Sequence, residues 1–159
     1  MTTPGELFLE AMASLASGVA VVTARRADGA PCGLAVTSVA SYSANPPSVL
    51  VSIDQASRCH VALSACDRLG LHLLHAGQEP LARTFAGKGD DKFAGLDWHW
   101  DDDVPALDGV LAYLRCRRAA NFQRYDHTVL IGDLESGRLE RGEPLVYARR
   151  RMDWLLNAN

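Results

Sequence analysis

Three parts of this sequence carry side chains whose type and spacing suit the binding of a polar ligand. The segment 33–47, GLAVTSVASYSANPP, threads hydroxyl groups through small apolar residues and ends in a double proline. The segment SRCH, which starts at Ser57, places a hydroxyl and a cation at the expected start of a helix. A single histidine, His127, lies within RYDHTVLIGDL. Together these parts form a scaffold of strand hydroxyls, a helix cap and one histidine.

The cluster Ser57-Arg58-Cys59 has the composition of a phosphate site. Anion sites are commonly built from helix N-terminal amides, short hydroxyls and one cation. Lys88 or Lys92 can supply that cation. Plain capping of the helix by Ser57 is the simpler alternative, and the residues alone leave both open.

Several catalytic classes are excluded because their motifs are missing. No G-x-G-x-x-G follows a strand, AGKGDD lacks the residues of a P-loop, and no G-x-S-x-G is present. His72 and His75 are expected on opposite faces of a strand, and Cys59 is directly followed by His60. Neither pair has the spacing of metal ligands, so these residues are interpreted as packing or edge residues and no metal is expected.

Composition points to a small protein that binds neither nucleic acid nor a membrane. The 159 residues carry a net charge of −3, with both signs scattered, and are expected to form one domain, 1–159. The basic run at 149–151 is short and is interpreted as a solvated face or a local phosphate contact. No apolar run approaches the roughly 20 residues that a membrane helix needs. Four scattered cysteines without a C-x-x-C pair fit reduced thiols in a cytoplasmic protein.

The periodicity predicts an N-terminal helix followed mainly by strands. Thr3 and Glu6 form a capping box around Pro4, and apolar residues follow at helical spacing until Gly18 ends the helix. Strands are expected over 18–26, 33–43, 48–54, 68–74, 110–122, 127–136 and 144–150, and short helices over 57–66 and 77–87.

The arrangement of these elements predicts the fold class. The Asp28-Gly29 turn is typical of an antiparallel hairpin, and helices do not follow every strand as a doubly wound sheet requires. The acidic segment 88–109 is expected to be an irregular surface excursion, with His99 in a surface β-segment. The chain is therefore predicted to be mainly antiparallel β with short helices, as a small closed or partly open barrel with helices at its edges.

A series of short motifs runs in a specific order along almost the whole chain, from about Phe8 to Tyr147. They are LASGVAVVTA, a DG turn, GxAxTSVASYSxNPP, SRCH, QxPLAxxFA, DKF, DHxxxIG and PLVY. In order and spacing this series resembles the flavin reductase family. The resemblance implies an FMN-binding split β-barrel of antiparallel, Greek-key strands that supplies reduced flavin to a two-component monooxygenase.

The resemblance also implies where the cofactor binds. The flavin is expected beside the strand pair 33–43 and 48–54, where small residues let the backbone approach a flat ring. The residues implied are Val36, Thr37 and Ser38 along the isoalloxazine, with Ser52, Ile53 and Asp54 close by; Ser57, Cys59 and Lys92 at the phosphate; and Phe85 and Ala86 flanking the ring system.

The implied reaction is hydride transfer from NADH or NADPH to FMN or FAD. The cofactors carry the difficult chemistry, and the protein must hold the two rings with the reacting atoms about 3–3.5 Å apart. His127 stands where the family places a histidine near the nicotinamide, with Asp126 to orient it. The alternative for His127 is that it merely ends a strand.

Three departures from the family pattern bear on activity. Ala35 and Thr37 stand where the family usually has a hydroxyl and an amide, and Cys59 replaces a phosphate-binding threonine. Tyr125 replaces the usual glycine before Asp-His, where its ring can occlude the nicotinamide side. Each lost hydrogen bond costs about 1 kcal/mol, or up to about tenfold in affinity. Loose binding suits an enzyme that treats its flavin as a substrate.

The resemblance finally implies a homodimer with the flavin near the subunit interface. The apolar face of the N-terminal helix and the segment 154–156 agree with such an interface. Two other functions stay open on the same fold. One is a non-catalytic flavin carrier in which Tyr125 blocks nicotinamide access; the other is an FMN-dependent oxidase or a deazaflavin-dependent reductase.

Overall fold

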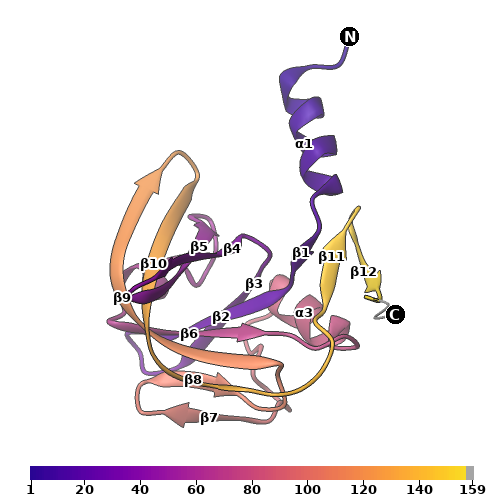
Figure 1. Ribbon diagram of the computed structural model, residues 1–159. Coiled ribbons are helices and arrows are strands. Elements are labelled where there is room, and N and C mark those ends of the chain that lie inside the picture. The colour runs from indigo at the N-terminus through magenta and orange to yellow at the C-terminus, as the bar shows by residue number, and fades with distance from the viewer. Residues whose placement is uncertain (157–159) are drawn as a thin grey trace.

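The computed structural model describes residues 1–156 and consists mainly of antiparallel strands, as the sequence predicted (Figure 1). The elements in chain order are α1 (Pro4–Ser14), β1 (Ser17–Gly18), β2 (Ala20–Arg25), β3 (Pro31–Val36), β4 (Val39–Ala44), β5 (Pro47–Asp54), α2 (His60–Ala65), β6 (Arg68–Leu73), α3 (Glu79–Ala86), β7 (Trp98–Asp101), β8 (Val104–Leu107), β9 (Ala112–Arg124), β10 (His127–Leu139), β11 (Val146–Ala148) and β12 (Arg151–Trp154).

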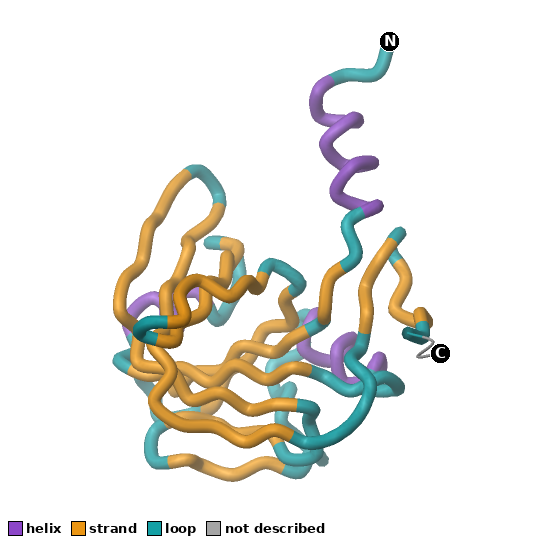
Figure 2. Tube along the Cα trace, viewed as in Figure 1, coloured by secondary structure: helices purple, strands orange, loops and turns teal. Residues whose placement is uncertain are grey.

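The main sheet has seven strands in the order β3-β2-β6-β9-β10-β5-β4, and every neighbouring pair is antiparallel. The two edge strands, β3 and β4, are consecutive in the chain and are joined only by Thr37 and Ser38. The sheet must therefore curl until its edges approach, as the bent strands in Figure 2 show. The backbone N–H of Ser52 donates to the Ser38 carbonyl at 3.1 Å beside this join. The single strand expected over 33–43 is thus two strands separated by a bend.

The core lies on both faces of the central strands. Alternate residues of β2 enter different apolar clusters, with Val22 in one and Val21 in the other. This alternation follows from the two-residue period of a strand. The first cluster lies inside the curl and is closed by Leu63 of α2; the second is covered by Phe85 of α3 and by the β7–β8 hairpin.

His72 of β6 is a packing residue, and its ring stacks on Tyr113 of the second apolar cluster. It is fully buried, its Nδ1 donates to the Val21 carbonyl at 3.0 Å, and its Nε2 accepts from the Leu107 N–H at 3.1 Å. Burial lowers the pKa of His72 to about 4, which keeps the ring neutral and both nitrogens engaged.

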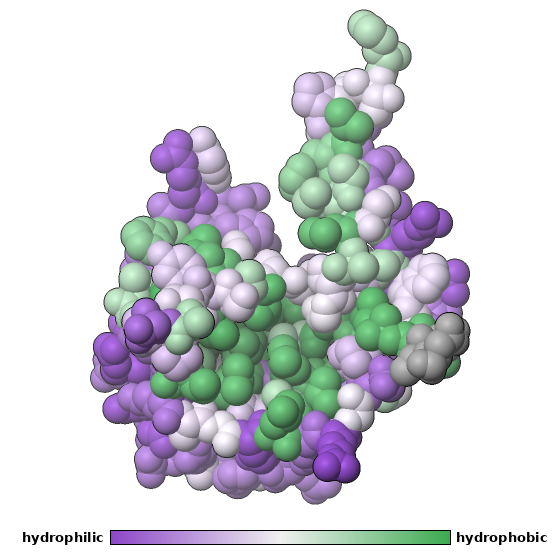
Figure 3. All heavy atoms as spheres, in the orientation of Figure 1, coloured by the Kyte–Doolittle hydropathy of each residue, from purple (hydrophilic) through white to green (hydrophobic). Residues whose placement is uncertain are grey.

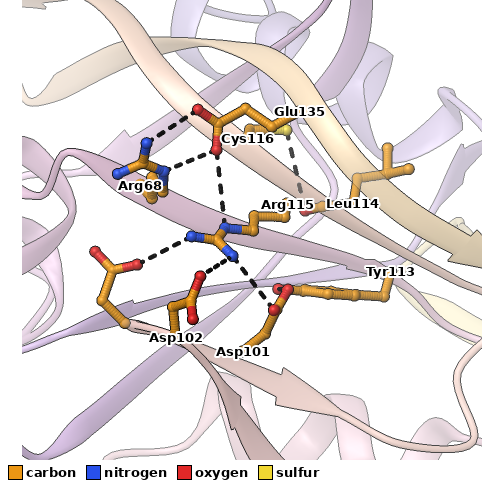
Figure 4. Close-up of polar contacts among 9 residues, drawn as sticks. Arg68, Asp101, Asp102, Tyr113, Leu114, Arg115, Cys116 and Glu135 are labelled. Carbon is orange, nitrogen blue, oxygen red and sulfur yellow. Dashed lines mark hydrogen bonds and ion pairs between the residues drawn. The ribbon is translucent and has the colours of Figure 1, made fainter.

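The acidic segment 88–109 differs from the prediction, because it ends in a hairpin whose second strand is buried. The side chains of β8 are inaccessible, with Val104 at 0% and Leu107 at 1% exposure. Figure 4 shows the reason: Arg115 of β9 pairs with Asp101 at 3.3 Å and with Asp102 at 2.8 Å. The acidic residues that suggested a surface loop neutralise an arginine on the sheet, so the apolar run that follows packs inward.

The same network ties three strands together. Glu135 of β10 accepts from Arg68 Nε at 2.7 Å and lies 3.8 Å from the Nε of Arg115. Tyr113 donates its hydroxyl to Asp101 at 2.9 Å, and burial raises the pKa of that phenol above its usual range. These contacts anchor the hairpin to the sheet and are structural.

Two helix boundaries differ from the expected ones. The capping box between Thr3 and Glu6 is present, but α1 ends at Ser14 rather than at Gly18. The helix expected over 57–66 begins only at His60, because the chain makes turns before it. The C-terminal strand expected over 144–150 is β11, which turns into β12.

Helix α1 projects from the rest of the molecule (Figure 1). None of its residues is buried, although apolar side chains occupy much of its surface (Figure 3). Its C-terminal end is tied to the β11–β12 turn, where the Arg149 N–H donates to the Ala13 carbonyl and Arg150 pairs with Glu10 at 3.4 Å. Within residues 1–156, no helix combines the length and apolar character needed to cross a membrane.

Candidate functional site

The bend between β3 and β4 lies against β5, so the segments 36–38 and 52–54 meet as expected. The Ser38 hydroxyl donates to the Ser52 carbonyl at 2.6 Å. Thr37 and Ser38 are exposed, whereas Val36 is 8% and Ile53 is 1% exposed. A ligand at this bend therefore meets hydroxyls and backbone, because the two larger apolar side chains belong to the core.

Phe85 and Gly33 form a tight contact next to the bend. A Cβ atom at Gly33 would lie 2.5 Å from the Phe85 ring, so only glycine permits this packing. The Phe85 ring is completely buried, while the following Ala86 is exposed. Phe85 reaches the site through its carbonyl oxygen, which accepts from Lys92 Nζ at 2.8 Å.

Residues around Cys59 form a small, partly open pocket, which we call the inner pocket. The Cys59 thiol donates to the Gly33 carbonyl at 3.1 Å, and Lys92 Nζ reaches the same carbonyl at 3.4 Å. Ser57 stabilises the turn by accepting the Cys59 N–H at 3.2 Å. The pocket has a volume of about 60 Å³, and its lining includes Arg26, Cys32, Gly33, Arg58, Cys59 and Lys92.

Three cations contribute to this lining, and two of them are ion-paired with aspartates. Arg58 is paired with Asp90, and Arg26 with Asp28 at 2.8 Å. Contact with the Cys32 thiol, together with the Lys92 charge, lowers the pKa of Cys59 to about 7. An ammonium, two guanidinium groups and a hydroxyl-capped turn suit an anionic group such as a phosphate.

A wider cleft adjoins the inner pocket. It has a volume of about 930 Å³ and shares Arg26, Arg58 and Asp90 with the pocket. The inner pocket therefore opens toward a wider cleft, whose lining also includes Val61, Ala62 and Ala65 of α2.

The turn between β9 and β10 forms the other end of the site, which we call the outer turn (residues 124–127). His127 lies directly opposite Asp54 of β5 in the sheet register. Gln55 fastens this turn to β5: its N–H donates to the Asp126 carbonyl at 2.9 Å, and its side-chain amide donates to the His127 carbonyl at 3.0 Å. The structure thus brings Asp54, Asp126 and His127 together.

His127 and Asp126 form an exposed pair. The His127 Nδ1 donates to Asp126 Oδ1 at 2.9 Å, and the side chains are 47% and 88% exposed. The hydrogen bond from His127 holds the pKa of Asp126 below its usual value. When His127 is neutral, this contact places its proton on Nδ1 and leaves Nε2 as an acceptor.

Tyr125 stands at the corner of the outer turn in a conformation that favours glycine. Its φ angle is 54°, its side chain is 83% exposed, and the Arg124 guanidinium lies 4.8 Å from its ring centroid. A non-glycine residue at positive φ is strained.

Sequence reasoning did not identify Arg26, Cys32 or Gln55. Arg26 and Cys32 flank the predicted hairpin turn, and Gln55 directly follows the predicted strand residue Asp54. The sequence shows that these residues lie next to predicted elements. It does not show that Arg26 and Cys32 lie near Cys59, or Gln55 near His127, because those contacts depend on how the chain folds.

The structure shows a curled antiparallel sheet with a pocket lined in part by cations at one end of the candidate site and an exposed histidine turn at the other. A family model described as "Flavin reductase like domain" matches residues 12–156. The chain therefore belongs to the flavin reductase family, which confirms the resemblance seen in its motifs.

Individual relatives agree with this assignment. The chain is 38% identical over 142 residues to an FMN reductase (NADH) of Agrobacterium fabrum, covering 89% of this chain and 80% of that protein. It is 35% identical over 144 residues to the reductase component of a 4-nitrophenol 4-monooxygenase of Rhodococcus opacus, covering 91% and 77%. A solved NADH:FAD oxidoreductase of Streptomyces globisporus, in complex with NAD and FAD fragments, superposes with a TM-score of 0.87 at 27% identity, covering 95% and 93%.

Proposed function

We propose that this chain transfers a hydride from NADH to FMN and releases the reduced flavin to a partner monooxygenase. The observation that carries the proposal is the match to the flavin reductase family across residues 12–156. Relatives named as an NADH-dependent FMN reductase and as a monooxygenase reductase component support the cofactors and the partner. NADPH and FAD are the alternative cofactors.

The inner pocket fits the phosphate of the flavin. Lys92 supplies a positive charge, and Ser57 and Cys59 supply a polar turn held in place by backbone contacts. The remaining proposed binding residues lie at the bend and along β5: Val36, Thr37, Ser38, Ser52, Ile53, Asp54 and, on α3, Phe85 and Ala86. Val36, Ile53 and Phe85 have buried side chains, so their proposed contribution is through the backbone. A bound flavin supplies the hydride acceptor, and the chain supplies position and charge.

The outer turn is proposed to position the nicotinamide. Asp126 fixes the His127 ring through Nδ1, so the Nε2 edge is available to a polar group of the nucleotide. Both side chains are solvent-accessible, which allows the dinucleotide to enter and leave during each turnover.

The proposed assembly is a homodimer formed through α1. An isolated helix of 11 residues has little stability in water, yet α1 exposes Phe8 at 61% and Leu9 at 59%. Figure 3 shows a second apolar area in the hollow of the same face. A two-fold dimer uses one self-complementary surface on both subunits, and these two areas together supply such a surface.

The dimer is tested by sedimentation of the full chain. Phe8→Glu is expected to give the monomer mass because it places a charge in the proposed interface. Val61→Glu is the matched control, because Val61 is an apolar residue of α2 with 78% exposure and lies outside α1. A Phe8→Glu protein that sediments like the unmodified chain contradicts the proposed interface.

The activity is tested by mixing the purified chain with FMN and NADH in air. Loss of reduced-nicotinamide absorbance above a protein-free control, saturating with flavin, is the expected result; repeats with FAD and NADPH identify the preferred pair. Flavin binding without nicotinamide oxidation favours the carrier alternative. Oxygen uptake with another substrate but not with NADH favours an oxidase.

A further inference from the structure

Two cysteines from distant parts of the sequence meet in the inner pocket. Cys32 lies on β3 and Cys59 immediately precedes α2, and both line the same cavity of about 60 Å³. Cys59 Sγ also reaches the carbonyl of Gly33, the residue that directly follows Cys32, and each thiol is the largest influence on the other's pKa. Their sulfurs are also held by carbonyls on neighbouring strands, Cys59 by Gly33 at 3.1 Å and Cys32 by Ala24 at 3.4 Å.

The two thiols are chemically unequal. The Cys32 contact and the Lys92 charge lower the pKa of Cys59 to about 7, whereas the Cys59 contact and burial raise that of Cys32. Burial raises the pKa of Cys66 to about 11 and that of Cys116 to about 12. Since the thiolate is the reactive form, Cys59 is the nucleophile of this set and Cys32 is its neighbour.

We propose that Cys32 and Cys59 form a reversible disulfide that regulates flavin binding in the inner pocket. The regulatory part rests on the proposed function, because it assumes that the flavin phosphate binds beside Cys59. The bond itself depends only on the two thiols in this pocket and an oxidant.

The oxidant is hydrogen peroxide, which free reduced flavin produces with dioxygen when no oxygenase consumes it. The Cys59 thiolate attacks one peroxide oxygen, the O–O bond breaks and hydroxide departs. The product is a sulfenic acid on Cys59. The Cys32 sulfur then attacks the Cys59 sulfur; the S–O bond breaks and water leaves with the Cys32 proton. Two thiols lose two electrons in total, and one peroxide is reduced.

The disulfide removes the thiol hydrogen bond from Cys59 to Gly33 and shifts the turn that Ser57 holds. Because Lys92 binds the same Gly33 carbonyl, its position changes with that turn. We expect the oxidised chain to bind FMN about tenfold more weakly, the cost of about one well-formed hydrogen bond. Flavin reduction would then slow when peroxide accumulates.

The bond is tested by mass spectrometry on the full chain without flavin. The chain is treated with peroxide, alkylated in denaturant and digested under non-reducing conditions. Trypsin leaves Cys59 and Cys66 on one peptide, so the digest is repeated in Cys66→Ser, which is expected to retain the link to the Cys32 peptide. Cys59→Ser is expected to lose it. Absence of a reductant-sensitive peptide containing Cys32 and Cys59 overturns the proposal.

Regulation is tested by titrating FMN into the reduced and the oxidised chain. The oxidised chain is expected to need about tenfold more FMN, with recovery after a dithiol reductant, and the ratio is expected to fall to about one in Cys59→Ser. A linked peptide with unchanged FMN affinity overturns the regulatory role. If the reduced chain neither binds nor reduces flavin, the proposed function fails, while the peptide map still decides the disulfide.

Discussion

The inner pocket and the outer turn lie at two ends of the same candidate site and are built in opposite ways. In the inner pocket, Cys59 is 5% exposed and Lys92 is held by two backbone carbonyls. In the outer turn, His127 and Asp126 are exposed and bind mainly to each other. The first end is a small pocket with a buried cysteine, whereas the second stays open to solvent.

This difference has a physical consequence for the proposed reaction. A charge is worth more in a partly buried pocket than at an exposed turn, where water and salt screen it. Changes in the inner pocket should therefore alter flavin affinity, and changes in the outer turn should alter nicotinamide turnover. Substitutions at both ends that change only FMN affinity, or only turnover with NADH, would contradict this division of roles.

The largest effect is expected from Lys92→Met, which keeps an unbranched side chain one atom shorter and removes the charge. Loss of a charge-assisted contact in a partly buried site should weaken FMN binding by about ten- to a hundredfold. Fluorescence titration of FMN measures this change. Lys88→Met is the matched control, because Lys88 is exposed and nearby in sequence. Equal FMN affinity in the two variants would remove Lys92 from the proposed site.

A smaller and different effect is expected from His127→Ala. Turnover with NADH should fall about tenfold, in the range of a lost positioning contact, while FMN affinity stays within about twofold. Steady-state kinetics and FMN titration on the same preparation separate the two. His99→Ala is the control, since His99 is exposed and pairs with an aspartate elsewhere. Unchanged turnover in His127→Ala would favour the alternative that His127 merely ends a strand and does not contact the nicotinamide.

The pH dependence of flavin binding sharpens the contrast. The pKa of Cys59 is lowered to about 7, so a thiolate accumulates in the inner pocket as the pH rises through that value. A thiolate repels the flavin phosphate, and FMN affinity should therefore fall by about threefold to tenfold between about pH 6.5 and about pH 8.5. Cys59→Ser should show a flat profile. Affinity that rises with pH in the unmodified chain would contradict this electrostatic account.

The smallest effect is expected from Tyr125→Gly. The substitution relieves backbone strain at a φ of 54° and removes an exposed ring beside His127. We expect the KM for NADH to fall by about twofold to threefold and thermal stability to stay equal or rise slightly. Leu139→Ala is the control, because Leu139 is 80% exposed and lies at the far end of β10. A higher KM in Tyr125→Gly would show that the ring binds the nucleotide instead of occluding it.

Local signals in the sequence determined several elements correctly. The capping box at Thr3 and Glu6 is present because it depends on residues only a few positions apart. The Asp28-Gly29 turn joins β2 to β3 for the same reason, with the Arg26 N–H bound to the Ala30 carbonyl at 2.8 Å. The two-residue period predicted the central strands, and the turns between them predicted the mainly antiparallel fold.

Non-local pairing decided the rest. Nothing near Asp101 in the chain predicts that Arg115 will neutralise it and allow β8 to be buried. Likewise, β3 and β4 are neighbours in sequence but occupy opposite edges of the sheet, because the order of the other strands separates them.

The composition of the site shows the same division. Ser57, Cys59 and Lys92 were identified from residue type and family resemblance, and their side chains and backbone do converge near Gly33. The placement of Cys32 and Cys59 in one pocket was not predictable, because it requires the turn before α2 to fold back onto β3. The sequence alone thus determined which side chains are available for binding and reaction. The tertiary structure decided which of them lie close together, because contacts between distant segments depend on the packing of the whole core.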